Sequence, residues 1–144
     1  MSEDAAMVLV VANRTAESPE LLKALQERAR RGPAKFHLLV PASPHGVSWM
    51  TDMNSGGEAA EHDVDGALSR LREKGLDVTG EVGDPDPVAA VQDAANTAAY
   101  DEVIISTLPK HVSKWLHLDL PSRAAHATGL PVTHVEGSRS KAPA

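Results

Sequence analysis

The sequence predicts a doubly wound α/β domain, in which helices cover both faces of a parallel β-sheet. Residues 7–12 form a continuous apolar run rich in β-branched side chains, a pattern typical of strands that are buried on both faces of a parallel sheet. Strand and helix patterns then alternate, so that five expected strands are joined by four crossovers that contain helices. This alternation favours a parallel sheet with right-handed connections.

The first expected helix begins at Ser18, a good N-cap residue, with Pro19 at the first helical position. Its apolar stripe consists of Leu21, Leu22, Leu25 and Ala29. The helix ends at residues 32–33, Gly-Pro, and residues 35–40 form the second strand. Residues 41–57 show no periodicity and exceed the usual length of a loop, so we expect either a functional lid or a mobile segment there.

Helical spacing of apolar residues predicts a helix over residues 58–74, which Gly75 ends. The apolar positions are Val64, Ala67, Leu68 and Leu71. Residues 76–82 form the third strand. The next helix is expected to begin with Asp84 as its N-cap and Pro85 at the first helical position. Four of its side chains are expected to face inward: Val88, Val91, Ala94 and Ala95.

The last third contains the fourth strand, residues 102–106, and a mostly helical stretch, residues 113–128. We expect a short helical piece first, and then a helix capped by Asp119 with Pro121 in its first turn. Gly129 ends this helix.

Residues 131–135 form the last strand, and residues 136–144 are expected to be a flexible tail. The chain of 144 residues therefore corresponds to one domain, 1–144, with its core in about 7–135.

Composition narrows the functional classes. The chain has no cysteine, which excludes disulfides and cysteinyl metal sites and is consistent with a reducing cytoplasm. No apolar run approaches the roughly 20 residues that span a bilayer, so we expect a cytoplasmic protein without a membrane partner. The net charge of −6 argues against nucleic acid as a partner.

Four segments carry a resemblance to a known family. They are VLVVANRT at 8–15, VGDP at 82–85, DEVIIS at 101–106, and the stretch 123–135 with TGLPV near its end. In this order and spacing they resemble the universal stress protein family over roughly residues 7–135. The resemblance implies a Rossmann-like sheet with strand order 3-2-1-4-5 and two helices on each face. It also implies a homodimer formed through the C-terminal strand, with Val132, His134 or Val135 near the twofold axis.

This family contains nucleotide binders and non-binders, and the binders carry Gly-x2-Gly-x9-Gly-Ser/Thr after the fourth strand. In this sequence Ser106 and Pro109 stand at the first two glycines, and the final pair falls near Leu118 and Asp119. Proline has no N–H and a fixed φ, whereas Asp119 would place a carboxylate beside the phosphates. The resemblance therefore implies that ATP binds poorly or not at all.

Other residues of the same loop favour an altered anion site. Lys110, His111, Ser113 and Lys114 supply positive charge and hydrogen-bond donors, and Thr107 keeps a hydroxyl directly after the strand. The alternative interpretation is a solvated basic loop that offsets nearby carboxylates.

Two further positions follow from the resemblance. Asn13 stands where nucleotide-binding members usually carry an acidic residue, with Thr15 close by; its amide could bind ribose or adenine, or form a turn. Val40 resembles an aliphatic position that lines an adenine pocket, although such a residue is often core. The candidate cofactor-binding residues are Asn13, Thr15, Val40, Thr107, Lys110, Ser113 and Lys114.

Metal and catalytic sites are not predicted. The seven histidines lack zinc-ligand spacing, and no Gly-x-Ser-x-Gly motif is present. A triad of Ser106, His111 and Asp119 would be an arbitrary selection among many such residues.

We therefore expect a dimeric stress-response interaction module without a cofactor and without chemistry of its own. The alternative is a member that binds ATP or another adenine nucleotide through an altered phosphate loop, with weak ATPase activity.

Overall fold

The computed structural model describes residues 5–12, 16, 18–42, 55–109 and 113–137, without the side chains of residues 55–63, 114 and 117. In chain order its elements are β1 (Ala6–Val11), α1 (Pro19–Arg30), β2 (Ala34–Pro41), α3 (Ser55–Glu73), β3 (Val78–Gly83), α4 (Pro87–Thr97), β4 (Glu102–Thr107), α5 (Lys114–His117), α6 (Leu120–Thr128) and β5 (Val132–Glu136). Most of the expected loop at 41–57 lies outside the described residues, and α3 already begins at Ser55.

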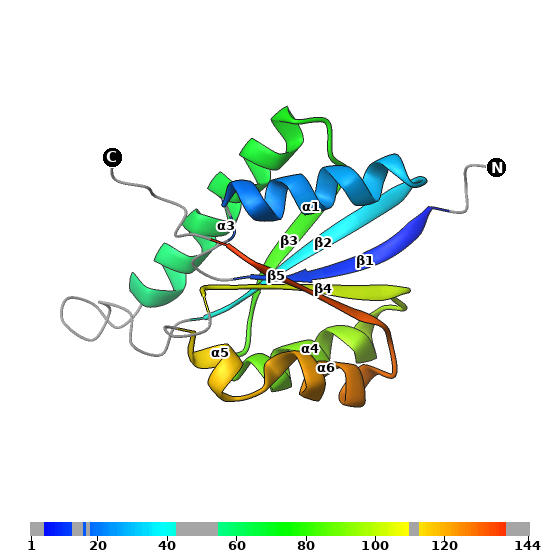
Figure 1. Ribbon diagram of the computed structural model, residues 1–144. Helices are drawn as coiled ribbons and strands as arrows, with labels where there is room; N and C mark the ends of the chain where they lie inside the picture. The colour runs from blue at the N-terminus through cyan, green and yellow to red at the C-terminus, as the bar shows by residue number, and fades with distance from the viewer. Residues whose placement is uncertain (1–4, 13–15, 17, 43–54, 110–112, 138–144) are drawn as a thin grey trace.

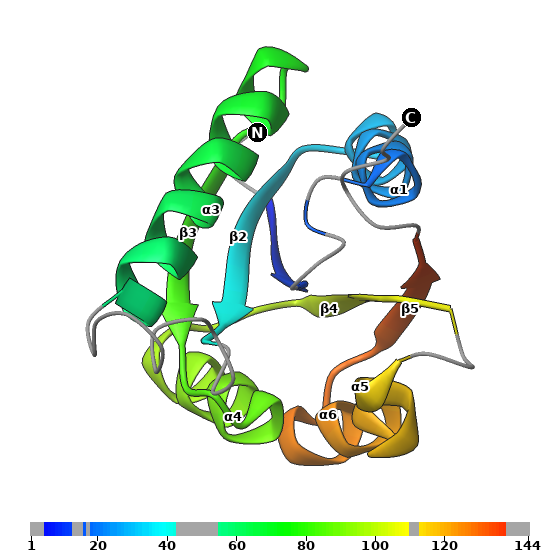
Figure 2. The ribbon, with the colours of Figure 1, turned by 90° about the vertical axis from the view of Figure 1, so that its left-hand side faces the viewer.

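The five strands form one parallel sheet in the order β3-β2-β1-β4-β5, which confirms the predicted fold class and strand order. Helices α1 and α3 cover one face of the sheet, whereas α4, α5 and α6 cover the other (Figures 1 and 2). All strands therefore end at the same edge of the sheet, on the left in Figure 1.

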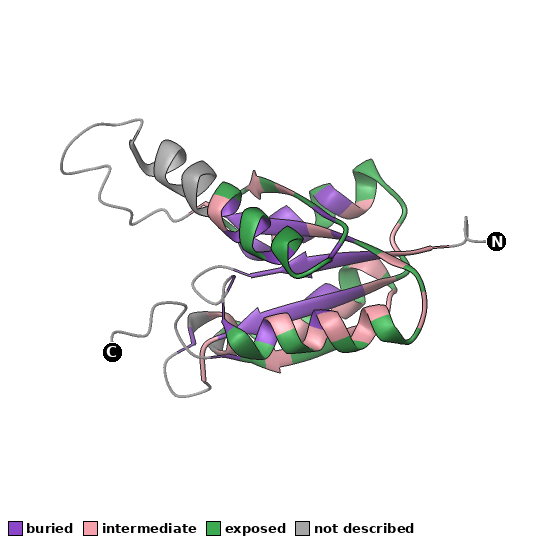
Figure 3. Ribbon diagram, turned by 90° about the horizontal axis from the view of Figure 1, so that it is seen from above, coloured by how far each residue is buried: buried purple, intermediate pink, exposed green. Residues whose placement is uncertain are grey.

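The core lies on both sides of β1, whose residues Val8 to Val11 are completely buried (Figure 3). Val8 and Val10 belong to the hydrophobic cluster beneath α1 and α3. Leu9 and Val11 belong to the cluster beneath α4 and α6. Successive side chains of a strand point to opposite faces, so this central strand has no exposed face, as its continuous apolar sequence predicts.

Helix α1 begins as predicted. Ser18 is fully buried, and its Oγ accepts a hydrogen bond from the Leu21 N–H at 3.1 Å. Pro19 occupies the first turn, where its missing N–H costs no hydrogen bond within the helix.

The predicted start of α4 is wrong by two residues. Asp86 is the N-cap, its Oδ1 accepting from the Val88 N–H at 3.0 Å, and Pro87 takes the first turn. Asp84 instead accepts from the Asp86 N–H at 2.8 Å in a turn that precedes the helix. The reason is Pro87, which disfavours a helical conformation for the residue before it and so keeps Asp86 extended, at φ −82° and ψ 113°.

None of the helices in the described part of the chain is long and apolar enough to span a membrane.

Candidate functional site

The candidate site lies at the carboxyl ends of the parallel strands. β1 lies between β2 and β4, so the connections after β1 and β4 leave toward opposite faces of the sheet. In doubly wound folds ligands bind at the carboxyl ends of strands where this change of direction occurs. The candidate residues that the family resemblance implies follow the ends of β1, β2 and β4, where such a ligand would lie.

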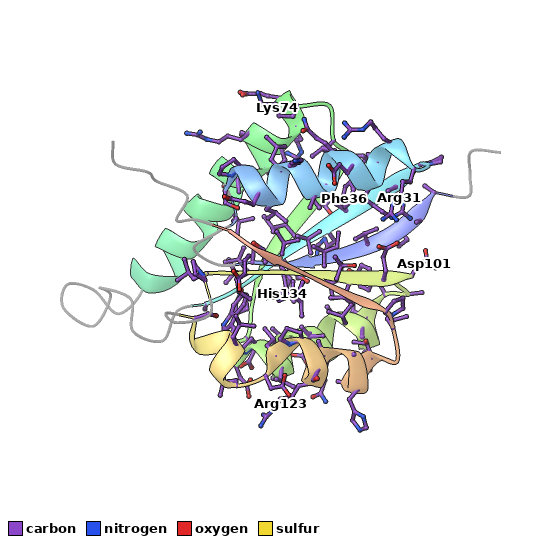
Figure 4. The ribbon with its side chains drawn as sticks, in the orientation of Figure 1. Arg31, Phe36, Lys74, Asp101, Arg123 and His134 are labelled. Carbon is purple, nitrogen blue, oxygen red and sulfur yellow. The ribbon has the colours of Figure 1, made fainter. Side chains whose placement is uncertain are left out.

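Thr107, the last residue of β4, is only 2% exposed. Its hydroxyl donates to the carbonyl oxygen of Leu108 at 2.8 Å, and His134 Nε2 of β5 lies 2.8 Å from the same Oγ1. The Leu108 carbonyl can only accept, and a hydroxyl has one proton. All three groups are satisfied when the His134 Nε2–H donates to Thr107. Figure 4 shows His134 beside this end of β4.

Ser113 is also engaged within the protein. Its side chain is buried, at 3% exposure, and its Oγ accepts from the Leu116 N–H at 3.1 Å. This contact caps the first turn of α5, which Lys114 begins. Lys110 and His111 lie outside the described residues, and the side chain of Lys114 is not described. The contribution of these three side chains to an anion site therefore stays a prediction.

At the ends of β1 and β2, too, only some of the candidate residues are described. Asn13 and Thr15 lie outside the described residues. Val40 is 5% exposed and packs in the same cluster as Ala12 and Ala16. Its position fits the interpretation of Val40 as a core residue.

Asp119 is the N-cap residue of α6 as predicted, with Pro121 in the first turn, but it does not cap the helix with its side chain. It has a left-handed backbone, with φ 59° and ψ 44°, and its side chain makes no capping hydrogen bond. The Asp119 N–H donates to the Leu116 carbonyl at 3.0 Å, closing α5, and the Asp119 carbonyl accepts from Arg123 in α6 at 3.0 Å. Asp119 therefore serves as the turn between two helices, and its left-handed conformation is one that aspartate tolerates better than most residues.

The chain after β5 is a part of this edge that the sequence analysis missed. The Gly137 N–H donates to the Thr107 carbonyl at 2.8 Å, and Gly137 is buried against Ser18 at the start of α1. The expected flexible tail at 136–144 is therefore wrong for residues 136 and 137, and residues 138–144 lie outside the described residues. Only the small size of Gly137 hinted at such a close approach.

A second polar cluster lies on β2 and β3, on the face that carries α4. His37 Nδ1 is 2.7 Å from Thr79 Oγ1, and His37 Nε2 is 3.0 Å from Glu81 Oε2. The His37 ring also stacks on Tyr100 with centroids 6.3 Å apart. Burial, and secondly the Glu81 carboxylate, raise the pKa of Tyr100 above its ordinary value.

Metal-binding geometry does not arise in the part of the chain that the structure describes, since no three histidine, aspartate or glutamate side chains come together there.

Comparison with known proteins identifies the fold. No family model matches the sequence, and a search of curated proteins finds no match. Solved structures do match. A universal stress protein from Archaeoglobus fulgidus aligns with a TM-score of 0.61 and 17% identity, covering 92% of this chain and 95% of the other.

Two further structures agree. A universal stress protein family member from Burkholderia pseudomallei has a TM-score of 0.65 at 14% identity, over 92% of this chain and 96% of its own. A family protein from Arabidopsis thaliana, solved with AMP bound, has a TM-score of 0.60 at 13% identity and covers 92% of both chains. The strand order and the near-complete coverage lead to one conclusion: this chain has the fold of the universal stress proteins.

Proposed function

We propose that this chain is a universal stress protein that acts as a dimeric interaction module in the cytoplasm, and that it lacks a conventional ATP site. The observation that carries the proposal is the state of the loop after β4. Thr107 and Ser113, the hydroxyls best placed to contact a phosphate there, are both almost completely buried and serve internal contacts.

The other residues of the loop support the same conclusion. Pro109 stands at the second glycine of the family motif and offers no N–H. Asp119 brings a carboxylate to the position of the motif hydroxyl. A lost hydrogen bond to a charged group and an unfavourable nearby charge each cost about 1–3 kcal/mol. Together they weaken ATP binding by about two decades or more.

A second candidate function is binding of an adenosine monophosphate. Structures with the same fold hold AMP in the Arabidopsis thaliana protein and dAMP in an Archaeoglobus fulgidus protein. A monophosphate needs fewer phosphate contacts than ATP, so it depends less on the missing glycines.

Native mass spectrometry of the freshly purified full chain separates the two functions. The interaction-module proposal predicts a protein mass without nucleotide, both as purified and after incubation with ATP or AMP. A retained AMP would support the second candidate and reject the first. Retained ATP would reject both. The variant Asp119→Ser is a useful companion, because it restores the motif hydroxyl, and it should retain more nucleotide wherever any is bound.

The dimer is proposed to form through the free edge of β5. Within the described residues β5 pairs only with β4. The Pro131 carbonyl and the Gly137 N–H both bond to β4, and backbone groups alternate in direction along a strand. The N–H groups of Val132 and His134 therefore point to the open edge, where a second β5 strand could pair with them.

A further inference from the structure

The outer surface of α4 and α6 carries a groove that the proposed function does not use. Its volume is about 530 Å³, and it is lined by Val88 and Gln92 of α4 and by Ser122, Arg123, His126 and Ala127 of α6. That volume is comparable to ligand pockets in general. All the lining residues except Val88 are exposed, so the groove is an open trough and not an enclosed cavity.

The groove combines an apolar surface with a polar rim that includes one cation, Arg123. Val88 and Ala127 supply the apolar contact area, while Gln92, Ser122, Arg123 and His126 supply side-chain donors. Among the described residues no carboxylate lines the groove, although the chain as a whole has a net charge of −6. Among the described residues, no hydrogen bond or ion pair engages the Arg123 side chain, which lies on the side of α6 away from the sheet (Figure 4).

We propose that this groove docks an acidic segment of a partner protein. An apolar side chain of the segment rests on Val88 and Ala127, and a carboxylate pairs with Arg123. A polar rim around an apolar centre is the usual composition of such a surface, and opposite charge on the partner increases the association rate and the specificity.

The shape and the charge exclude two other occupants. A small molecule in an open trough would keep much of its surface in water, whereas pockets for small ligands bury most of the ligand. A second copy of the same groove would bring two Arg123 side chains into one interface without a carboxylate from the described lining residues, because a twofold contact pairs each patch with itself. An extended or helical segment can instead follow the length of the trough between the two helices.

The test uses the full chain and a fluorescein-labelled peptide of about 12 residues, with leucines four residues apart and glutamates between them. A matched peptide carries lysine in place of every glutamate. We expect the acidic peptide to bind and to shift the backbone amide signals of Gln92, Arg123 and Ala127 in a ¹H–¹⁵N spectrum. Its affinity should fall as the salt concentration is raised. The lysine peptide should not bind.

Two charge reversals then locate the contact. Arg123→Glu should lower the affinity for the acidic peptide by about tenfold or more. Arg31→Glu makes the same charge change at the end of α1, on the opposite side of the sheet (Figure 4), and should change the affinity by less than about twofold. Equal effects of the two reversals would mean that only net charge matters, and would overturn the proposal.

Other results would also overturn it. Equal binding of the lysine peptide, or amide shifts confined to other surfaces, would exclude a docking groove for acidic segments. Shifts of the same amides on dilution of the protein alone would identify a second copy as the occupant, and the same shifts with free glutamate would identify a small anion.

Discussion

Gly137 offers the sharpest test of how the chain closes over the start of α1. A Cβ atom at this position would lie 2.6 Å from Ser18 Oγ and 3.1 Å from Ser18 Cβ. Gly137 has no strained φ, so alanine is compatible with the backbone, and the close contact alone decides the outcome of Gly137→Ala. Because Ser18 is fully buried and caps α1, it cannot move away without disturbing the cap.

The expected loss of stability in Gly137→Ala depends on which of the two residues moves. If Ser18 moves, the cap weakens, which costs about 1 kcal/mol. If Gly137 moves, its hydrogen bond to the Thr107 carbonyl weakens, which costs about 0.5–1.5 kcal/mol. With added strain, Gly137→Ala should lower the free energy of unfolding by about 1–3 kcal/mol, or the melting temperature by about 3–9 °C.

A double-mutant cycle read by chemical denaturation checks the mechanism. Ser18→Gly removes both contacting atoms, and by itself it should cost only a few tenths of a kcal/mol, because glycine is an acceptable N-cap. In the Ser18→Gly background, Gly137→Ala should therefore have almost no cost. If Gly137→Ala costs the same in both backgrounds, or less than about 0.5 kcal/mol in the native background, the reasoning fails.

Three further predictions follow from other contacts. Val132→Pro removes an outward N–H of β5, so it should give a folded monomer by light scattering, whereas Thr133→Pro, which faces β4, should destabilise the fold; a Val132→Pro dimer would exclude this edge. Asp86→Ala should cost about 1 kcal/mol by loss of the α4 cap, clearly more than Asp84→Ala, and the reverse order in denaturation would restore Asp84 as the cap. Unfolded Tyr100 ionises near its ordinary pKa of 10.0 while the folded protein still holds the proton, so stability should fall as pH rises through 10; Tyr100→Phe should lose less stability between about pH 9 and 11, and an equal loss would contradict the raised pKa.

The sequence predicted the architecture because its local signals agree with one another. The apolar run in β1, the Ser18-Pro19 start of α1 and the Gly129 end of α6 each specify a local conformation that the fold retains. The alternation of such elements leaves few possible topologies, and the resemblance to the universal stress proteins supplied the strand order.

The wrong N-cap of α4 and the side-chain contacts that the sequence did not predict have two physical causes. The Asp-Pro-Asp-Pro stretch at 84–87 offers two equivalent N-caps, and the choice depends on the effect of Pro87 on Asp86. The contact of His134 with Thr107 joins strands that are far apart in sequence, as does the contact of His37 with Glu81. These contacts depend on the sheet register, which composition and periodicity do not encode.

The candidate site was predictable only in part for the same reason. The sequence located the loop after β4 and its missing glycines. It could not reveal that Thr107 also contacts His134 of β5, since that contact depends on the sheet register, whereas the contact of Ser113 with the Leu116 N–H is local.

Isothermal calorimetry of ATP binding to the full chain tests the central claim most directly. With the Thr107 and Ser113 hydroxyls engaged, and with proline and aspartate at the motif positions, we predict no saturable heat at ATP concentrations up to about 1 mM. Saturable binding with a Kd below about 10 μM would contradict the account and would show that the chain binds ATP.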